Sequence, residues 1–199
     1  MAMAATDIAI FAKAPVPGTA KTRLIPAIGA HAAAVLQERL TARAVATALD
    51  AQTGLVTLWC TPDTTHRSFQ QLGVALQRQP DGDLGARMLA AFRGRPTLVI
   101  GTDCPALTAA HLRAAASALD SHEAVLTPAA DGGYVLIGAR AAHPELFSGM
   151  DWGVPSVLAE TRRRIAALGL AAAELPPLWD VDTEDDLARM ERAFPELAL

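Results

Sequence analysis

Short apolar runs alternate along this chain with longer alanine-rich segments that have helical spacing. The apolar runs, which predict strands buried on both faces, cover residues 7–12, 55–60, 97–101, 124–127 and 134–138. The segments in which we expect helices are residues 30–50, 64–72, 84–93, 109–119, 155–168 and 184–193. Because buried strands that alternate with helices are typical of a mainly parallel sheet covered on both faces, the pattern predicts a three-layer α/β fold.

Residues that favour helix starts agree with these limits. Thr108 and Thr183 each stand directly before an expected helix, and Pro155 stands where a first helical turn accepts proline. Thr183 and Asp186 also have the spacing of a capping box. No segment rich in proline, glycine and serine divides the chain, so we expect a single domain over residues 1–199.

The first expected strand leads directly into a cationic loop, residues 13–24. Lysine supplies a point charge and arginine a fork of donors that matches phosphate oxygens, while prolines stiffen the loop and glycine permits close backbone approach. Ligands of parallel sheets bind beyond the carboxyl ends of the strands. We therefore prefer phosphate binding to a merely solvated loop. The positions assigned to phosphate binding are Lys13, Gly18, Lys21, Thr22 and Arg23.

Two common phosphate motifs are excluded here. A Walker loop requires glycine directly before its lysine, but Ala20 precedes Lys21. A dinucleotide fingerprint requires three glycines at the end of the strand, and this loop has only Gly18. The loop is therefore expected to hold phosphate mainly through cationic side chains.

Acidic residues follow other expected elements. Asp103 stands at the end of a buried strand, where a carboxylate can hold Mg²⁺ or Mn²⁺ together with substrate phosphates; the alternative is a turn residue. Asp180 and Asp182 share a side of the extended segment before the last helix, and one of them can complete the metal site. We favour Asp182, although acidic residues near a helix start are ordinary stabilisers.

Glycine-rich segments form two further candidate sites. Residues 131–134, Asp-Gly-Gly-Tyr, form either a hairpin turn or a close backbone contact with a ligand. Trp152 can stack on a base or sugar, or cover the edge of the core. The candidates for an acceptor or sugar pocket are Gly132, Gly133, Tyr134 and Trp152.

The second glycine-rich segment opens the helix expected at residues 84–93. Gly82 and Asp83 stand at its start, where backbone amides can face an anion, and Arg87 can reach the same anion. A capped helix with a surface arginine explains these residues equally well.

Composition limits the kinds of partner. The chain has 199 residues, a net charge of −4 and no long basic run, which argues against nucleic acid or an anionic membrane. There is no signal-peptide pattern and no apolar run long enough to span a bilayer, so we expect a soluble cytoplasmic protein with two buried, reduced cysteines, Cys60 and Cys104. The apolar content also permits a homodimer. No Ser/His/Asp or Cys/His set is evident, so acyl transfer has no support.

Taken together, several segments resemble a bacterial glycosyltransferase-like family, once labelled a domain of unknown function and also called the radical-SAM/selenodomain-associated transferase family. It belongs with the nucleotide-diphospho-sugar transferases. The matching segments, in the family's order, are residues 13–24, 82–88, 101–105, 128–134, 152 and 180–183. Gly153 departs from the family, which usually has serine at that position.

This resemblance implies a Rossmann-like fold of glycosyltransferase type A. It also implies that Asp103 is the metal-binding aspartate, with Asp182 as a second ligand of Mg²⁺ or Mn²⁺. Lys13, Lys21 and Arg23 would then face the nucleotide phosphates. The first loop is also similar to that of the phospholactate guanylyltransferases, so the resemblance leaves two reactions open.

We therefore expect a metal-dependent transferase that uses a nucleotide-activated substrate, in the first place a nucleotide sugar. Asp103 and Lys21 would act at the departing phosphate, and Asp131 is the candidate base toward an acceptor hydroxyl. The alternative is a guanylyltransferase-like nucleotidyltransferase that joins a nucleoside triphosphate to a phosphorylated acceptor. A non-catalytic nucleotide sensor is a third interpretation.

Overall fold

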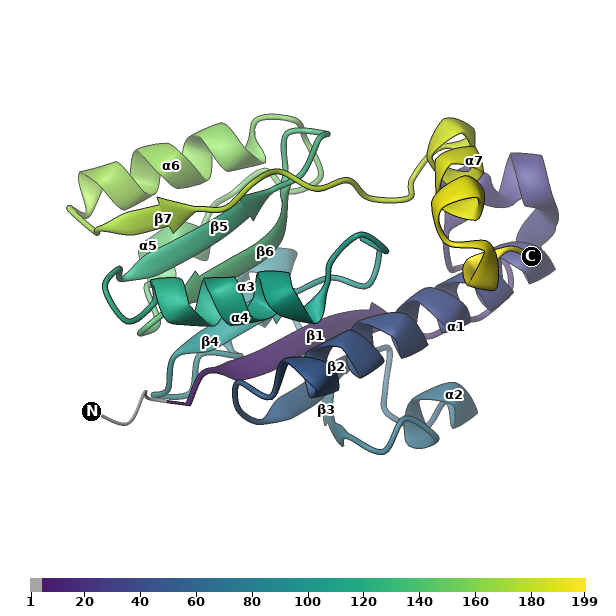
Figure 1. Cartoon of the computed structure of the whole chain (residues 1–199), viewed down its shortest axis with the longest axis horizontal. Coiled ribbons are helices and arrows are strands. Elements are labelled where there is room, and N and C mark those ends of the chain that lie inside the picture. The colour runs from purple at the N-terminus through teal and green to yellow at the C-terminus, as the bar shows by residue number, and fades with distance from the viewer. Residues whose placement is uncertain (1–4) are drawn as a thin grey trace.

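The structure, a computed structural model, describes residues 5–199 and contains one seven-stranded sheet (Figure 1). The order of the strands is β3-β2-β1-β4-β6-β5-β7. Every pairing is parallel except the two that β6 makes, with β4 and with β5, so the predicted mainly parallel sheet is confirmed. The strands are β1 (Asp7–Lys13), β2 (Val56–Thr61), β3 (Ala75–Arg78), β4 (Thr97–Ile100), β5 (Ala124–Pro128), β6 (Tyr134–Ala139) and β7 (Ala172–Glu174).

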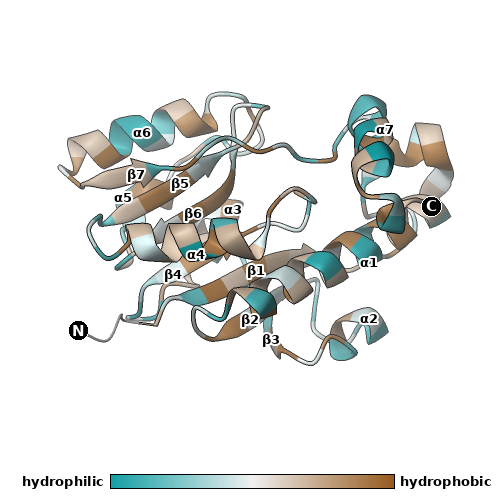
Figure 2. Ribbon diagram, in the orientation of Figure 1, coloured by the Kyte–Doolittle hydropathy of each residue, from teal (hydrophilic) through white to brown (hydrophobic). Residues whose placement is uncertain are grey.

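Helices cover both faces of the sheet. The α-helices are α1 (Ile25–Ala51), α2 (Arg67–Gln70), α3 (Leu84–Leu89), α4 (Ala109–Ala118), α5 (Pro144–Phe147), α6 (Val157–Ala167) and α7 (Glu184–Ala193). Two short 3₁₀ helices, η1 (Thr22–Leu24) and η2 (Pro195–Leu197), precede α1 and follow α7. In Figure 1, α1 and α4 lie on the near side of the sheet. The hydrophilic residues are prominent on α6 and α7, whereas the central strands are largely hydrophobic (Figure 2).

Alternation along β1 explains the layers. Ile8 and Ile10 pack in a core cluster with residues of α1 and α4, whereas Ala9 belongs to a second cluster with residues of α3, α5 and α6. Successive side chains of a strand point to opposite faces, so one strand contributes to both cores. The expected three-layer α/β arrangement is therefore confirmed.

A third cluster lies beyond the sheet and joins the first half of α1 to the C-terminal helices. It contains Leu36 of α1, Met190 of α7, Leu197 of η2 and Val181, which lies in the segment before α7. All four are at most 5% exposed. Figure 1 shows α7, in yellow, beside the beginning of α1. This cluster holds the segment around Val181 beside Asp103, beyond the carboxyl end of β4.

Several limits differ from the sequence predictions. The edge strands β3 and β7 and the short helix α5 were not predicted. Helix α1 begins at Ile25 and continues through Gly29, whose φ of 80° produces a kink. Pro155 does not lie in the first turn of α6, because Ser156 is the residue before the helix. Thr108 and Thr183 do cap α4 and α7, each in a capping box.

Other predictions meet the structure only in part. Cys60 is buried and Cys104 is half-buried, and both are free thiols. Burial raises the pKa of each thiol to about 12. Within residues 5–199, no helix is long and apolar enough to cross a membrane. The single domain over residues 1–199 stays a prediction.

Candidate functional site

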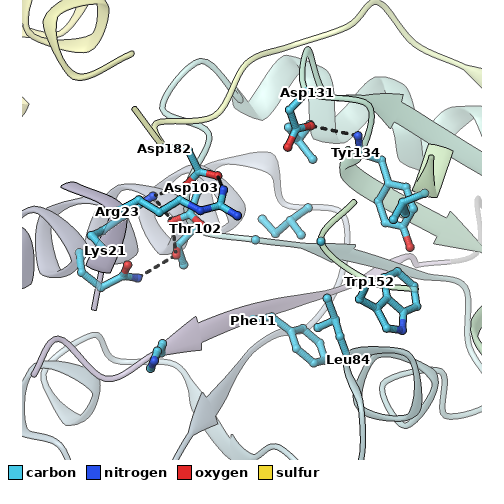
Figure 3. Close-up of a pocket in the computed structure, with 18 of the residues that line it drawn as sticks. Phe11, Lys21, Arg23, Leu84, Thr102, Asp103, Asp131, Tyr134, Trp152 and Asp182 are labelled. Atoms are coloured by element: carbon cyan, nitrogen blue, oxygen red, sulfur yellow. Dashed lines mark hydrogen bonds and ion pairs between the residues drawn. The ribbon is translucent and has the colours of Figure 1, made fainter. Parts of the chain in front are cut away.

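A cavity of about 560 Å³ opens at the carboxyl ends of β1 and β4. Side chains from loops far apart in the sequence line it (Figure 3). Its polar lining includes Lys13, Lys21, Thr22, Arg23, Thr102, Asp103, Asp131 and Asp182. Its apolar lining includes Phe11, Leu84, Met88, Tyr134, Val154 and Trp152. The cavity therefore has a charged part and an apolar part.

Lys21 is the centre of the charged part. Its backbone has a left-handed conformation, with φ 46° and ψ 44°, and its side chain is only 4% exposed. The ammonium Nζ lies 2.7 Å from Asp103 Oδ1 and 3.7 Å from Asp182 Oδ1. It also donates to the backbone carbonyl of Val181 at 2.6 Å. The first loop, the end of β4 and the segment before α7 therefore meet at one ammonium group.

Arg23 adds a second cation at the same place. Its Nη1 lies 3.1 Å from Asp182 Oδ2, and its side chain is exposed. The two acidic segments are also joined through the backbone, because Val181 N donates to Asp103 O at 2.9 Å. On the other side, Gln37 of α1 donates to Thr102 Oγ1 at 3.0 Å, which fixes the residue before Asp103. The positions of the charged groups are thus set by several elements.

The donor set can be compared with the needs of a divalent ion. Oδ1 of Asp103 and Oδ1 of Asp182 converge on one cation, the Lys21 ammonium. Among residues 5–199, no group of three or more His, Cys, Asp or Glu side chains could hold a metal ion. Two carboxylates fit the mode in which Mg²⁺ is bound by one or two carboxylates plus substrate phosphates. These residues therefore fit a metal ion that binds together with a phosphate ligand.

Asp180, the other acidic candidate, is in a different environment. Its pKa is raised to about 7, mainly by burial and also by the neighbouring carboxylates of Asp103 and Asp131, while Lys21 opposes this shift. Asp182, in contrast, lines the cavity. This placement agrees with our preference for Asp182, whose role as a metal ligand stays a prediction.

The apolar part is formed by aromatic and aliphatic side chains. The ring of Phe11 stacks on Trp59, with ring centroids 5.6 Å apart and planes 4° from parallel. Trp152 packs over Gly85, where an added Cβ would lie 2.9 Å from the indole. Burial raises the pKa of the Tyr134 hydroxyl. Trp152 therefore both lines the cavity and packs on the core, so the two interpretations of this residue are compatible.

Two polar atoms in this apolar part are buried without a partner. Within residues 5–199, the hydroxyl of Tyr134 and the indole Nε1 of Trp152 make no hydrogen bond. Buried polar groups normally have partners, so each unpaired one calls for an explanation.

The loop between β5 and β6 forms another wall. Asp131 Oδ1 accepts a hydrogen bond from Gly133 N at 3.0 Å, and both residues line the cavity. Gly132 does not line it. Instead, an added Cβ at Gly132 would lie 2.2 Å from the carbonyl oxygen of Pro155. The loop is therefore a turn between antiparallel strands, as the hairpin interpretation expects, and also a part of the cavity wall.

Four of the predicted phosphate-binding residues do not line the cavity and have local structural roles instead. Asp83 caps α3 by accepting from Ala86 N at 2.8 Å, and Arg87 Nε donates to Gly82 O at 3.0 Å. Gly18 has a φ of 84° with no atom within 4 Å of an added Cβ, so its conformation rather than close approach requires glycine. The phosphate-binding roles of these four residues stay predictions.

Sequence reasoning missed the apolar wall. Phe11, Leu84 and Met88 were interpreted as strand and helix residues, because a hydrophobic side chain in such a run usually belongs to the core. One signal was available: Phe11 stands near the carboxyl end of β1, the edge at which such sheets bind ligands.

Comparison with solved structures defines the class first: the fold is that of the nucleotide-diphospho-sugar transferases. A Desulfovibrio desulfuricans G20 protein with the provisional name nucleotide-diphospho-sugar transferase aligns with a TM-score of 0.87 and 29% identity, over 96% of this chain and 88% of that chain. CMP:2-keto-3-deoxy-manno-octonic acid synthetase in complex with CTP aligns with a TM-score of 0.62 and 11% identity, over 96% and 99% of the two chains.

A third structure shares the fold at low identity. Glucosyl-3-phosphoglycerate synthase from Mycobacterium tuberculosis, in complex with Mn²⁺, UDP and glucosyl-3-phosphoglycerate, aligns with a TM-score of 0.59 and 13% identity, over 98% and 78% of the chains. At such low identities, this structure and the CTP complex show only that the fold is shared.

The chain belongs to the DUF2064 family, described as uncharacterized proteins conserved in bacteria, whose model matches residues 42–154. The resemblance seen in the sequence to a bacterial family of unknown function is therefore confirmed. No curated protein matches the chain. The matched segment contains Asp103, Asp131 and Trp152, whereas Lys21 and Asp182 lie outside it.

Proposed function

We propose that this protein is a metal-dependent transferase that acts on a nucleotide-activated substrate, in the first place a nucleotide sugar. One observation carries the proposal: Asp103 and Asp182 converge on the Lys21 ammonium, at 2.7 and 3.7 Å, in the wall of a cavity at the carboxyl ends of the strands. Such an arrangement combines a place for a divalent ion with cations for a diphosphate.

Asp103 and Asp182 would hold Mg²⁺ or Mn²⁺. When bound, such an ion neutralises charge on the diphosphate oxygens. Lys13, Lys21 and Arg23 line the cavity and would stabilise the charge that develops on the departing phosphate. Lysine does so as a point charge and arginine through paired donors.

The acceptor would enter on the side of the β5–β6 loop. Asp131 is exposed, lines the cavity, and would accept the proton of an acceptor hydroxyl. Tyr134 and Trp152 lie on the same side (Figure 3), and Gly133, which donates to Asp131, also lines the cavity. These three residues would surround the acceptor or the sugar. The buried Tyr134 hydroxyl and Trp152 Nε1, which have no partner within residues 5–199, would be candidates to bind polar atoms of that ligand after rearrangement.

Nucleotidyl transfer is the second candidate. Lys13, Lys21 and Arg23 concentrate three positive charges in one short loop, which suits a leaving pyrophosphate. The CTP complex of a protein with the same fold supports this candidate, and the complex with Mn²⁺ and UDP supports the first. A cytoplasmic location and a homodimer stay predictions in either case.

Thermal unfolding with a ligand panel tests the proposal. We expect Mn²⁺ with UDP, GDP or a nucleotide sugar such as UDP-glucose to raise the Tm by several degrees, because a ligand that binds only the folded state stabilises it. If only CTP or GTP raises the Tm in the presence of Mn²⁺, and nucleoside diphosphates and nucleotide sugars do not, the result would select nucleotidyl transfer. If no nucleotide in the panel shifts the Tm, the proposal is wrong.

Asp103→Asn should abolish the part of the shift that depends on Mn²⁺, and with it any turnover. The matched control is Asp120→Asn, which removes an exposed carboxylate after α4 that does not line the cavity. An Asp103→Asn protein that retains the full Mn²⁺-dependent shift would show a purely structural aspartate. Binding that survives without any turnover of a bound substrate would favour the sensor interpretation.

A further inference from the structure

The Lys21 ammonium lies between the two carboxylates that the proposed function assigns to a divalent ion. Three oxygen atoms surround it: Asp103 Oδ1 at 2.7 Å, the Val181 carbonyl at 2.6 Å and Asp182 Oδ1 at 3.7 Å. Carboxylate and carbonyl oxygens are also the ligands that hard divalent cations take in proteins. The Lys21 side chain is 4% exposed, whereas those of Asp103 and Asp182 are 45% and 37% exposed. The cation is therefore enclosed between two carboxylates that solvent still reaches.

Charge counting shows what an incoming metal ion meets. Lys21 and Arg23 are paired with Asp103 and Asp182, so these four charges cancel. A free divalent ion would therefore meet two carboxylates that already have cations as partners. Like charges a few ångströms apart repel one another strongly at the effective dielectric of a protein surface. A metal ion that arrives with a diphosphate brings negative charge that can receive the displaced ammonium.

Lysine at position 21 suits a cation that can be replaced by a metal ion. The chain has two lysines, Lys13 and Lys21, against 15 arginines, and both lysines are in the first loop. Arginine binds carboxylates through a planar fork with two parallel hydrogen bonds, whereas lysine is a compact point charge on a flexible stem. A compact ammonium can occupy a metal position and leave it again.

We propose that Lys21 is a resident counter-ion that competes with the divalent metal for Asp103 and Asp182 and moves to the phosphates when metal and nucleotide bind together. The metal ion alone therefore binds weakly, and the nucleotide strengthens its binding. This inference rests on the proposed function for the identity of the nucleotide, but the competition between Lys21 and the metal does not.

The test is the affinity for Mn²⁺ alone, measured from the free Mn²⁺ signal in electron paramagnetic resonance. Lys21→Met removes the competitor, so this variant should bind Mn²⁺ roughly tenfold more tightly than the wild type, within the range of ordinary coupling between sites. The matched control is Lys13→Met, which removes an equal charge from the exposed last residue of β1. Its gain should be no more than about threefold, because only screened long-range repulsion is lost.

Lys21→Gln guards against a folding defect in Lys21→Met. Glutamine is neutral but can still donate a hydrogen bond to Asp103 or to the Val181 carbonyl. It should show a similar gain in Mn²⁺ affinity with a normal circular dichroism spectrum. If neither folded Lys21 variant gains more Mn²⁺ affinity than Lys13→Met does, the proposed competition between Lys21 and the metal ion is wrong.

Addition of UDP separates this inference from the proposed function. In the wild type, UDP should tighten Mn²⁺ binding, and this coupling should fall in Lys21→Met because the displaced ammonium is missing. With only two lysines, ¹⁵N-lysine spectra offer a direct view: the Lys21 ammonium signal should move with Mg²⁺ and UDP together and stay with Mg²⁺ alone. A gain in Mn²⁺ affinity without any binding of UDP or of the other nucleotides would refute the proposed function and keep the competition. If UDP tightens Mn²⁺ binding but the Lys21 variants show no gain in Mn²⁺ affinity, the proposed function is kept and the competition is refuted.

Discussion

Gly132 and Gly153, which lie in two loops near the cavity, both have positive φ angles, 91° and 79°. Their surroundings differ. An added Cβ at Gly132 would lie 2.2 Å from the Pro155 carbonyl oxygen, whereas no atom lies within 4 Å of one at Gly153. Glycine is therefore required at position 132 both by the backbone conformation and by the lack of space for a side chain, whereas at position 153 only the conformation requires it.

Alanine substitution should separate these needs. Gly153→Ala should lower the free energy of unfolding by about 1 kcal/mol, the usual cost of a left-handed non-glycine residue. Gly132→Ala should lower it by about 3 kcal/mol or more, because the backbone of Pro155 must also move. Urea unfolding of the two variants measures both values. Equal losses would show that the two loops do not pack as closely as described.

Individual site residues differ in how far the sequence could predict them. Asp103 and the first loop were found because polar residues at the carboxyl ends of parallel strands meet at one edge. The contact of Lys21 with Val181 and Asp182 was not predictable in detail, because these residues are about 160 positions apart and only the packing of α7 brings them together. Roles that depend on a ligand, such as that of Asp131 as a base, stay predictions.

At the scale of elements, burial decides what the sequence could predict. Strands β1, β4, β5 and β6 are mostly buried and gave clear apolar runs. Strands β3 and β7 lie at the edges, have four and three residues, and contain no fully buried residue, so they left no such signal. Helix α1 was predicted to start too late, because glycine usually marks an end of a helix whereas Gly29 only kinks this one.

Helix α6 provides a prediction on pH. Glu160 accepts hydrogen bonds from Arg163 and Arg164, which lower its pKa to about 2. Arg164 in turn donates to the carbonyl oxygens of Ser148 and Gly149 after α5, at 2.6 and 3.1 Å. The ionised glutamate therefore orders an arginine that ties α6 to α5.

A carboxyl group with a lowered pKa stabilises the folded state only while it is ionised. The contribution of Glu160 should be complete above its normal pKa of about 4.5 and be lost as the pH falls toward 2. Glu160→Gln should therefore be less stable than the wild type at pH 7 and equal to it near pH 2. Unfolding curves at a series of pH values measure this difference. A constant difference across the range would contradict the charge-based explanation.

At the scale of the whole molecule, the third core cluster determines whether the site forms. Val181, whose carbonyl accepts from Lys21, belongs to this cluster together with Leu36 and Met190. One side of the charged site is thus supported from outside the sheet. The stability of this cluster and the binding of the nucleotide should change together.

Met190→Ala tests this link. Met190 is 0% exposed, and removal of a buried methionine side chain costs about 2–5 kcal/mol in the free energy of unfolding. We also expect weaker binding of Mn²⁺ with UDP, because Val181 and Asp182 lose their support. The control is Leu199→Ala, at a side chain that is 46% exposed, with an effect within about 0.5 kcal/mol. Calorimetry gives both quantities, and unchanged binding in Met190→Ala would separate the cluster from the site.

The wide separation of Lys21 and Asp182 along the chain has a consequence for biosynthesis. A ribosome that adds 5–20 residues per second needs roughly ten to thirty seconds to pass from one to the other. During that interval, Lys21 and Asp103 can meet on the nascent chain without the segment that closes the site. Nucleotide capture should therefore begin only after the segment around Asp182 has been made and has packed against α1, and retention on a nucleotide resin would report that this packing is complete in the newly made enzyme.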